Sequence, residues 1–345
     1  MKYLNIALLV LGCALLAALI WTVGPGELWH ELASLGWGLI PFAFCEGAAE
    51  MIHTLGWRHC LSGNLRSISW FRLYRIRMAG YAINYLTPTA SLGGEVTKTT
   101  LLATQSQVSR AASGVLIGKV CFGLAHLLFV ALGIPVVMHT VHLGAPIWIP
   151  LLLSATLVAG GIVIFLLLQK NGKLGAPTRW LVAKGIGGRT VEKIAANFTA
   201  VDEELRAFYR EHPLDMCFAI CWHLVGYSIG IAQTWFFLHL LHPPASLATA
   251  AAVWFMGMWF DLLTFAIPLN AGSLEGTRIL AFKLIRYGAP LGLAYGVALR
   301  LAQLIWAATG LVLYGELTAR KATSPQRLGK TDQKQPANRT VTNPQ

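Results

Sequence analysis

Residues 111–138 read AASGVLIGKVCFGLAHLLFVALGIPVVM, and Lys119 is the one Lys, Arg, Asp or Glu among them. An α-helix needs about 20 apolar residues to cross the hydrocarbon core of a bilayer. The run exceeds that length without a polar face. It therefore predicts a helix that crosses a membrane.

Similar apolar runs recur along the chain. Of its 345 residues, 55% are hydrophobic and 12% are charged, and the mean hydropathy is +0.58. A soluble domain is about 25% charged, so this composition excludes a soluble enzyme and a disordered protein. We predict an all-α polytopic membrane protein with five further spans near 4–22, 36–57, 147–168, 214–240 and 290–315.

The first of these spans needs a separate argument, because Lys2 followed by an apolar run to Trp21 resembles a secretory signal peptide. The run is longer than the apolar part of a signal peptide, and no small-residue cleavage site follows it. We expect a retained first helix at 4–22.

The net charge of +12 does not indicate nucleic-acid binding, because the basic residues are confined to a few segments. Most of them lie at Lys2, in 58–77, in 169–213 and after residue 316. This is the asymmetry of cytoplasmic loops in membrane proteins. We expect a multi-pass protein of the bacterial inner membrane with both termini in the cytoplasm.

Two apolar segments are broken by proline. Segment 70–87 runs into Pro88 and a polar stretch at 88–105, and segment 246–267 runs into Pro268 and a polar stretch at 268–287. Proline ends the helix before it. We predict two re-entrant-type hairpins that enter the membrane and return.

These hairpins belong to an internal repeat. A shift of 180 residues superposes the pattern Pro-x6-Glu-x-Thr-Lys/Arg on itself and aligns the flanking spans without a gap. Counting crossings places the two copies in opposite orientations, the inverted-topology repeat of many secondary transporters. The predicted domain is 1–318, with repeat units 34–138 and 214–318, and the tail 319–345 is expected to be disordered.

The loop 169–213 is the largest soluble segment. Within it, 191–209 has an amphipathic pattern with Leu205 and Phe208 on its apolar side. Such a helix lies on the inner membrane surface or docks a partner, and the pattern alone leaves both open.

The two Pro-containing motifs carry the strongest candidates for a substrate site. Glu95 and Lys98 are three residues apart on one helix face, and so are Glu275 and Arg278. Helix N-termini at these positions also suit a phosphate. Each pair therefore lines a substrate path or forms an internal salt bridge, and the two roles are compatible.

Further polar side chains fall within predicted spans, where ionisable groups are costly. Glu50 shares one face with Glu46 and His53, which suits a proton relay, a headgroup contact or interhelical ion pairing, and Lys119 is placed to neutralise either carboxylate. The remaining candidates are Asn84 in the first hairpin, Asp261 in the second, Arg300 in the last span, and Arg72, Arg75 and Arg77, which contact inner-leaflet phosphate or anchor the topology.

Catalytic and metal signatures are weak. We find no Walker A sequence, no serine elbow and no zinc-binding helix. The spacings His139-x-x-His142 and His239-x-x-His242 fit a metal less well than an interfacial position, and six scattered Cys suit helix packing. We expect no enzymatic activity, no metal and no cofactor.

At the two motifs the sequence resembles a known family. Asn84, Thr87-Pro88-Thr89, Gly93-Gly94-Glu95 and Lys98, with the later Pro268, Gly272 and Glu275-Gly276, are similar to the flippase-like membrane domain of lysylphosphatidylglycerol synthases. The resemblance covers roughly residues 5–315. The full synthases add a soluble aminoacyl-transfer domain, so we expect a stand-alone member that does not itself make lysyl-lipid.

The resemblance implies that an aminoacylated or other anionic phospholipid moves between leaflets through a cavity between the repeats. It implies that Pro88, Glu95, Lys98, Glu275 and Arg278 line that cavity. One alternative is an accessory membrane protein or enzyme of isoprenoid or hopanoid lipid biosynthesis, with biosynthetic partner proteins. Another is a small-solute transporter driven by protons. The oligomeric state and the lipid are left open.

Overall fold

A computed structural model describes most of the chain. The described residues are 14, 17–86, 92–141, 171, 176–184, 199, 202–241, 244–264 and 272–323, with single positions within 149–167. Every regular element in these residues is a helix. The prediction of an all-α protein is confirmed for them.

The helices follow the apolar runs of the sequence. Their bounds are α2 Pro25–Leu35, η1 Gly36–Gly38, α3 Leu39–His59, η2 Gly63–Ser67, α4 Trp70–Leu86, α5 Leu92–Leu102, α6 Val108–Thr140, α8 Ala176–Ala183, α10 Pro213–Leu241, α11 Leu247–Thr264, α12 Ser273–Leu284 and α13 Ala289–Thr323. Residues 202–211 are also helical.

Four helical stretches are long and apolar enough to cross a membrane. They are Pro25–His59, Val108–Thr140, Pro213–Leu241 and Ala289–Ala319. They confirm four of the predicted spans, because an uninterrupted apolar run of this length has few alternatives to a transmembrane helix. The predicted spans 4–22 and 147–168 lie largely outside the described residues.

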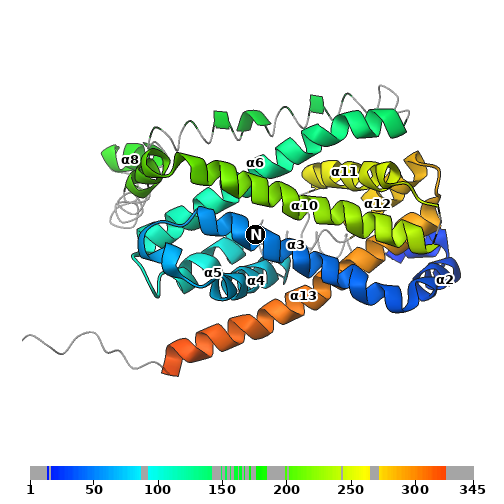
Figure 1. The fold of residues 1–345 in the computed structure, drawn as a ribbon, viewed down its shortest axis with the longest axis horizontal. Helices are drawn as coiled ribbons and strands as arrows, with labels where there is room; N and C mark the ends of the chain where they lie inside the picture. The colour runs from blue at the N-terminus through cyan, green and yellow to red at the C-terminus, as the bar shows by residue number, and fades with distance from the viewer. Residues whose placement is uncertain are drawn as a thin grey trace, which may run out of the picture.

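The four long helices α3, α6, α10 and α13 run along the long axis of the molecule (Figure 1). The shorter pair α4 and α5 lies toward the left end, and the pair α11 and α12 lies toward the right end. Helix α3 packs on α10, while α13 contacts α3, α4 and α12, and α6 contacts α5, α10 and α11. Each short pair thus packs against three of the long helices.

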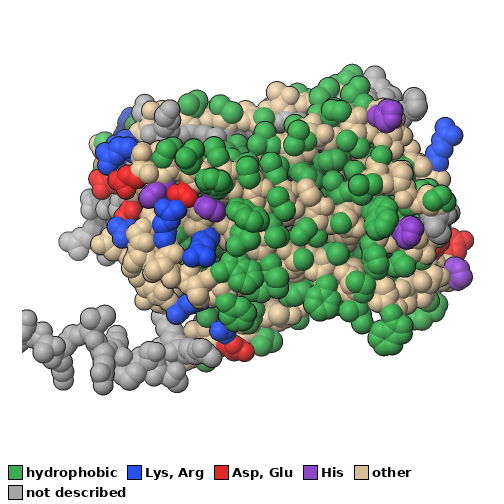
Figure 2. Space-filling model, viewed as in Figure 1, with side chains coloured by type: hydrophobic (Ala, Val, Ile, Leu, Met, Phe, Trp, Pro, Cys, Tyr) green, Lys and Arg blue, Asp and Glu red, His purple; other side chains and the backbone are tan. Residues whose placement is uncertain are grey.

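The visible surface between the two ends of the molecule is mostly apolar. Hydrophobic side chains cover most of the visible face, and most of its Lys, Arg, Asp and Glu gather at the left end, on the side of α8 (Figure 2). Exposed large side chains include Phe44, Leu132 and Val312. An apolar band of this kind is stable only against lipid. The chain is an integral membrane protein.

The charged end contains part of the predicted amphipathic helix. Leu205 and Phe208 are buried, in a core cluster that includes Leu61 and Leu65. In 202–211 the apolar side therefore faces the protein, and a position on the membrane surface is wrong for this part. The protein core near η2 offers a closer apolar partner than lipid.

Two other predicted boundaries lie partly in the described residues. Helix α13 continues to Thr323, into the tail predicted to be disordered from residue 319. Residues 87–91 and 265–271, including Pro88 and Pro268, lie outside the described residues.

Candidate functional site

The first hairpin is closed by direct backbone contact between α4 and α5. The side chain of Asn84 accepts a hydrogen bond from the Gly94 N–H at 2.6 Å. A Cβ atom on Gly94 would overlap the carbonyl oxygen of Gly80 and the Asn84 amide. Small residues permit this close approach. Asn84 thereby holds the start of α5, where Glu95 follows.

Glu95 binds two lysines. Its carboxylate lies 2.5 Å from Nζ of Lys98, three residues later, and 3.3 Å from Nζ of Lys119 on α6. The predicted Glu95–Lys98 pair is confirmed. The expectation that Lys119 neutralises Glu46 or Glu50 is wrong, because α6 places it beside α5. Nζ of Lys98 also lies 5.5 Å from the centre of the Trp57 ring, a cation–π distance.

Glu50 is neutralised from α4. Nε of Arg77 lies 2.6 Å from Oε2 of Glu50. Both side chains are mostly buried, so Arg77 takes part in helix packing in addition to any role in topology. Nearby, the Tyr81 hydroxyl donates a hydrogen bond to Glu46 at 3.5 Å.

The second motif pairs differently from the first. Arg278 binds Asp261 of α11 through two parallel hydrogen bonds, Nη1 to Oδ1 at 3.0 Å and Nη2 to Oδ2 at 2.8 Å. Its guanidinium covers Gly257, where a Cβ atom would lie 2.8 Å from Cζ. The side chain of Arg278 is only 3% exposed. Two parallel bonds are the strong geometry for an arginine and a carboxylate.

Glu275 binds a residue of α13, the second helix that packs against α12. Its side chain is 0% exposed and binds Arg300 of α13, with Oε2 at 3.0 Å from Nη2 and a second contact between Nε and Oε1. A Glu275–Arg278 salt bridge is therefore wrong. The two residues share one turn of α12, but α11 and α13 each supply a closer partner.

Both motifs thus place paired charges among the helices of the apolar bundle. Glu95, Glu275 and Arg278 each have a partner on another helix, and Lys98 pairs with Glu95 on α5 itself. Burying a charge in lipid or protein is costly unless it is paired. Lys119 differs from the others, because 45% of its side chain is exposed. It offers a cation that a ligand can reach without unfolding the bundle.

Sequence reasoning missed several participants. It named Asp261 and Arg300 with interhelical ion pairing as one reading, which is confirmed, but it did not identify Arg278 and Glu275 as their partners. It also missed His223, whose ring meets that of His53 at 3.1 Å. The pattern His-x-x-Gly, present at His53-x-x-Gly56 and at His223-x-x-Gly226, was the available signal.

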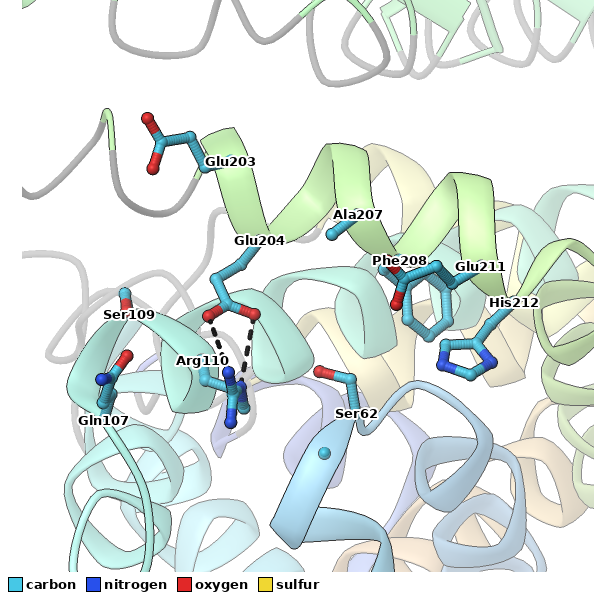
Figure 3. Close-up of a pocket in the computed structure, with 11 residues that line it drawn as sticks. Ser62, Gln107, Ser109, Arg110, Glu203, Glu204, Ala207, Phe208, Glu211 and His212 are labelled. Atoms are coloured by element: carbon cyan, nitrogen blue, oxygen red, sulfur yellow. Dashed lines mark hydrogen bonds and ion pairs between the residues drawn. The ribbon is translucent and has the colours of Figure 1, made fainter.

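A hollow lies at the charged end, apart from these pairs. It has a volume of about 480 Å³ and lies between residues 62–63, the start of α6 and 203–212 (Figure 3). Arg110 and Glu204 face one another across it, with Nη2 and Oε1 3.3 Å apart. None of the predicted site residues lines it, so we do not assign the substrate to it.

In the described part of the chain, no group of three or more His, Cys, Asp or Glu is placed to hold a metal.

Comparison with known families gives one match. The family model described as "Lysylphosphatidylglycerol synthase TM region" matches residues 7–310. Comparison with curated proteins and with solved structures gives no match. The matched residues include both motifs, all of α3, α6 and α10, and α13 as far as residue 310.

Proposed function

Since the chain belongs to the lysylphosphatidylglycerol synthase TM region family, we propose that it moves an anionic or aminoacylated phospholipid between the leaflets of the bacterial inner membrane. Family membership indicates a membrane lipid-related function. Translocation, rather than catalysis, is the activity we infer, because the charged residues found in the bundle are paired with one another and follow no catalytic pattern.

The observation that carries this proposal is the three-membered group Glu95, Lys98 and Lys119. Glu95 shares its single negative charge between two cations, so the group has one positive charge in excess. A phosphate or carboxylate of a lipid headgroup supplies the missing negative charge. Lys119, the most exposed member, reaches it first.

Glu275 and Arg300 form a second charged group that corresponds to the first. Glu95 on α5 binds a cation on α6, and Glu275 on α12 binds a cation on α13. The two carboxylates are equivalent under the shift of 180 residues. We propose that a headgroup passes from one group to the other while its acyl chains stay in lipid.

An inverted repeat explains this equivalence. The element order α3, α4, α5, α6 matches α10, α11, α12, α13, and the contact of α4 with α13 has a counterpart in that of α11 with α6. The hairpins α4–α5 and α11–α12 lie toward opposite ends of the bundle (Figure 1). These features support two oppositely oriented re-entrant hairpins, and we propose that both chain termini lie in the cytoplasm.

Exchange of headgroup-labelled phospholipids between leaflets of proteoliposomes tests the proposal. Lys119→Gln removes the excess positive charge and is expected to slow exchange of anionic lipid about tenfold, the effect of one lost charged contact of about 1.4 kcal/mol. Lys283→Gln is the matched control, because Lys283 is an exposed lysine in the last turn of α12. It should leave the rate unchanged.

Equal rates for wild type and Lys119→Gln would contradict the assigned role of Lys119. A wild-type protein that exchanges no phospholipid class would overturn phospholipid translocation. That result would favour the alternative of an accessory role in isoprenoid or hopanoid lipid synthesis, for which loss of a lipid product on gene deletion is the readout.

A further inference from the structure

Two histidines meet in the interior of the bundle. Nδ1 of His53 on α3 lies 3.1 Å from Nδ1 of His223 on α10. Their residues are 4% and 0% exposed. Nε2 of His223 is buried and has no hydrogen-bond partner in the described residues. Neither ring is needed for the ion pairs described above.

The helices are shaped around this contact. A Cβ atom on Gly226 would lie 2.5 Å from the His53 ring, and one on Gly56 would lie 2.8 Å from the His223 ring. Each histidine therefore occupies the space left by a glycine on the opposite helix. The arrangement is reciprocal, and it makes the packing of α3 on α10 depend on both rings.

The short contact fixes how many protons the pair holds. In a hydrogen bond between two Nδ1 atoms, one ring donates Nδ1–H and the other accepts with a lone pair. The donor ring then has an unprotonated Nε2, which takes up one proton without breaking the bond. A second proton would have to enter at the accepting Nδ1 and would put two cations in contact. The pair is thus built for a single added proton.

Its surroundings oppose that proton while the helices are closed. Aromatic rings enclose the pair, with the Phe122 centre 5.0 Å and the Tyr227 centre 4.9 Å from that of His53. The charged and titratable groups around it are Glu50 on α3, Arg77 on α4, Lys98 on α5, His126 on α6 and Tyr227 on α10. Glu50 is bound by Arg77, and Glu95 is bound by Lys98 and Lys119, so neither carboxylate is free to stabilise a proton added to the pair.

We propose that His53 and His223 form a one-proton binding site whose occupancy favours separation of α3 from α10. A buried cation beside Arg77 and Lys98 is unfavourable, whereas hydrated rings accept the proton. Protonation therefore shifts the population toward a conformation in which the two helices part. This deepens the proposed function, on which it rests, by naming the proton as the coupling ion.

Unfolding of the purified full-length protein in detergent tests the site without any lipid transport. Between pH 8 and pH 5 the unfolding temperature of the wild type is expected to fall by a few degrees. His53→Gln and His223→Gln should each lose part of this pH dependence, because the unfolded chain protonates the two imidazoles separately, and the double variant should lose more than either one. His239→Gln, an exposed histidine near the end of α10, should behave as the wild type.

Single and double variants that all keep the wild-type pH dependence would overturn the proposal. Nitrogen-15 spectra of histidine-labelled wild type provide a readout that needs no variant. The pair should give one protonated and one unprotonated Nδ1 coupled to each other at high pH. Two rings that are both protonated at Nε2 and show no such coupling would contradict the hydrogen bond between the two Nδ1 atoms.

Lipid exchange separates this inference from the proposed function. For a one-proton site the exchange rate changes by at most about tenfold per pH unit, and the dependence disappears in His223→Gln. A wild type that moves no lipid, yet unfolds with the predicted pH dependence, would refute translocation and keep the proton site. A pH-independent exchange rate in the wild type would refute the coupling.

Discussion

At the scale of single residues, the contact between Glu275 and Arg300 is the most deeply buried ion pair described here. Glu275 is 0% exposed. Removing one member of a buried pair leaves the other charge uncompensated, at a cost of about 3–5 kcal/mol. We therefore expect Glu275→Gln to lower the unfolding temperature markedly, as measured in detergent.

The reversed pair, Glu275→Arg with Arg300→Glu, is expected to recover most of that loss, because it restores opposite charges at the same two positions. Arg210→Gln is the control. Arg210 and Glu211 are 80% and 55% exposed, and such pairs contribute little. A reversed pair no more stable than Glu275→Gln would show that the charge pairing is not what stabilises this contact.

The residue scale is also where the sequence was least informative. Spacing along a helix shows that Glu275 and Arg278 share a face, and that Glu95 and Lys98 do. It does not show which neighbouring helix brings a competing charge. Glu275 and Arg278 do not bind each other, because Arg300 binds Glu275 and Asp261 binds Arg278. Glu95 does bind Lys98, and it also binds Lys119.

At the scale of helices, glycines determine how closely α11 approaches its neighbours. A Cβ atom on Gly230 of α10 would overlap the Trp254 ring, and one on Gly133 of α6 would overlap the Phe255 ring. The Trp254 ring is fixed, because its Nε1 donates to the carbonyl of Tyr227 at 3.0 Å. Gly230→Ala is therefore expected to destabilise the protein by about 1–3 kcal/mol.

Gly315→Ala on α13 provides the comparison. A Cβ atom there meets nothing within 4 Å, so the higher helix propensity of alanine should stabilise the protein by up to about 1 kcal/mol. Thermal unfolding in detergent measures both. If Gly230→Ala were as stable as Gly315→Ala, α11 would have room to move away from α10.

Helices were easier to predict than their contacts. The spans 36–57, 111–138, 214–240 and 290–315 follow from apolar length alone, because lipid requires a continuous helix of that length. Helices α4 and α11 are described as far as Leu86 and Thr264, and Pro88 and Pro268, which are expected to end them, lie outside the described residues. In contrast, the apolar side of 202–211 is equally compatible with lipid and with protein, and only the position of η2 and α6 decided between them.

At the scale of the whole molecule, the arrangement of the two hairpins determines what passes through the membrane. If α4–α5 and α11–α12 enter from opposite sides, each charged group is reached from one leaflet, and a headgroup need cross only the distance between them. If either hairpin crossed completely, the orientation of every later span would reverse. Charge distribution supports the first arrangement, since Arg66 precedes the first hairpin and Arg72 and Arg75 lie in the first turns of α4.

Cysteine labelling in sealed inverted and right-side-out vesicles distinguishes these arrangements. In a chain without its native cysteines, Ser69→Cys and Gln107→Cys flank the first hairpin. Ser246→Cys precedes the second hairpin, and Lys283→Cys lies in its last turn. We expect the first two to react with a membrane-impermeant reagent from the cytoplasmic side, together with a cysteine in the tail. The second two should react from the opposite side only. Labelling of Ser69→Cys and Gln107→Cys from different sides would mean that α4–α5 spans the membrane. That result would contradict the inverted repeat, and with it the proposed passage of a headgroup from the Glu95 group to the Glu275 group.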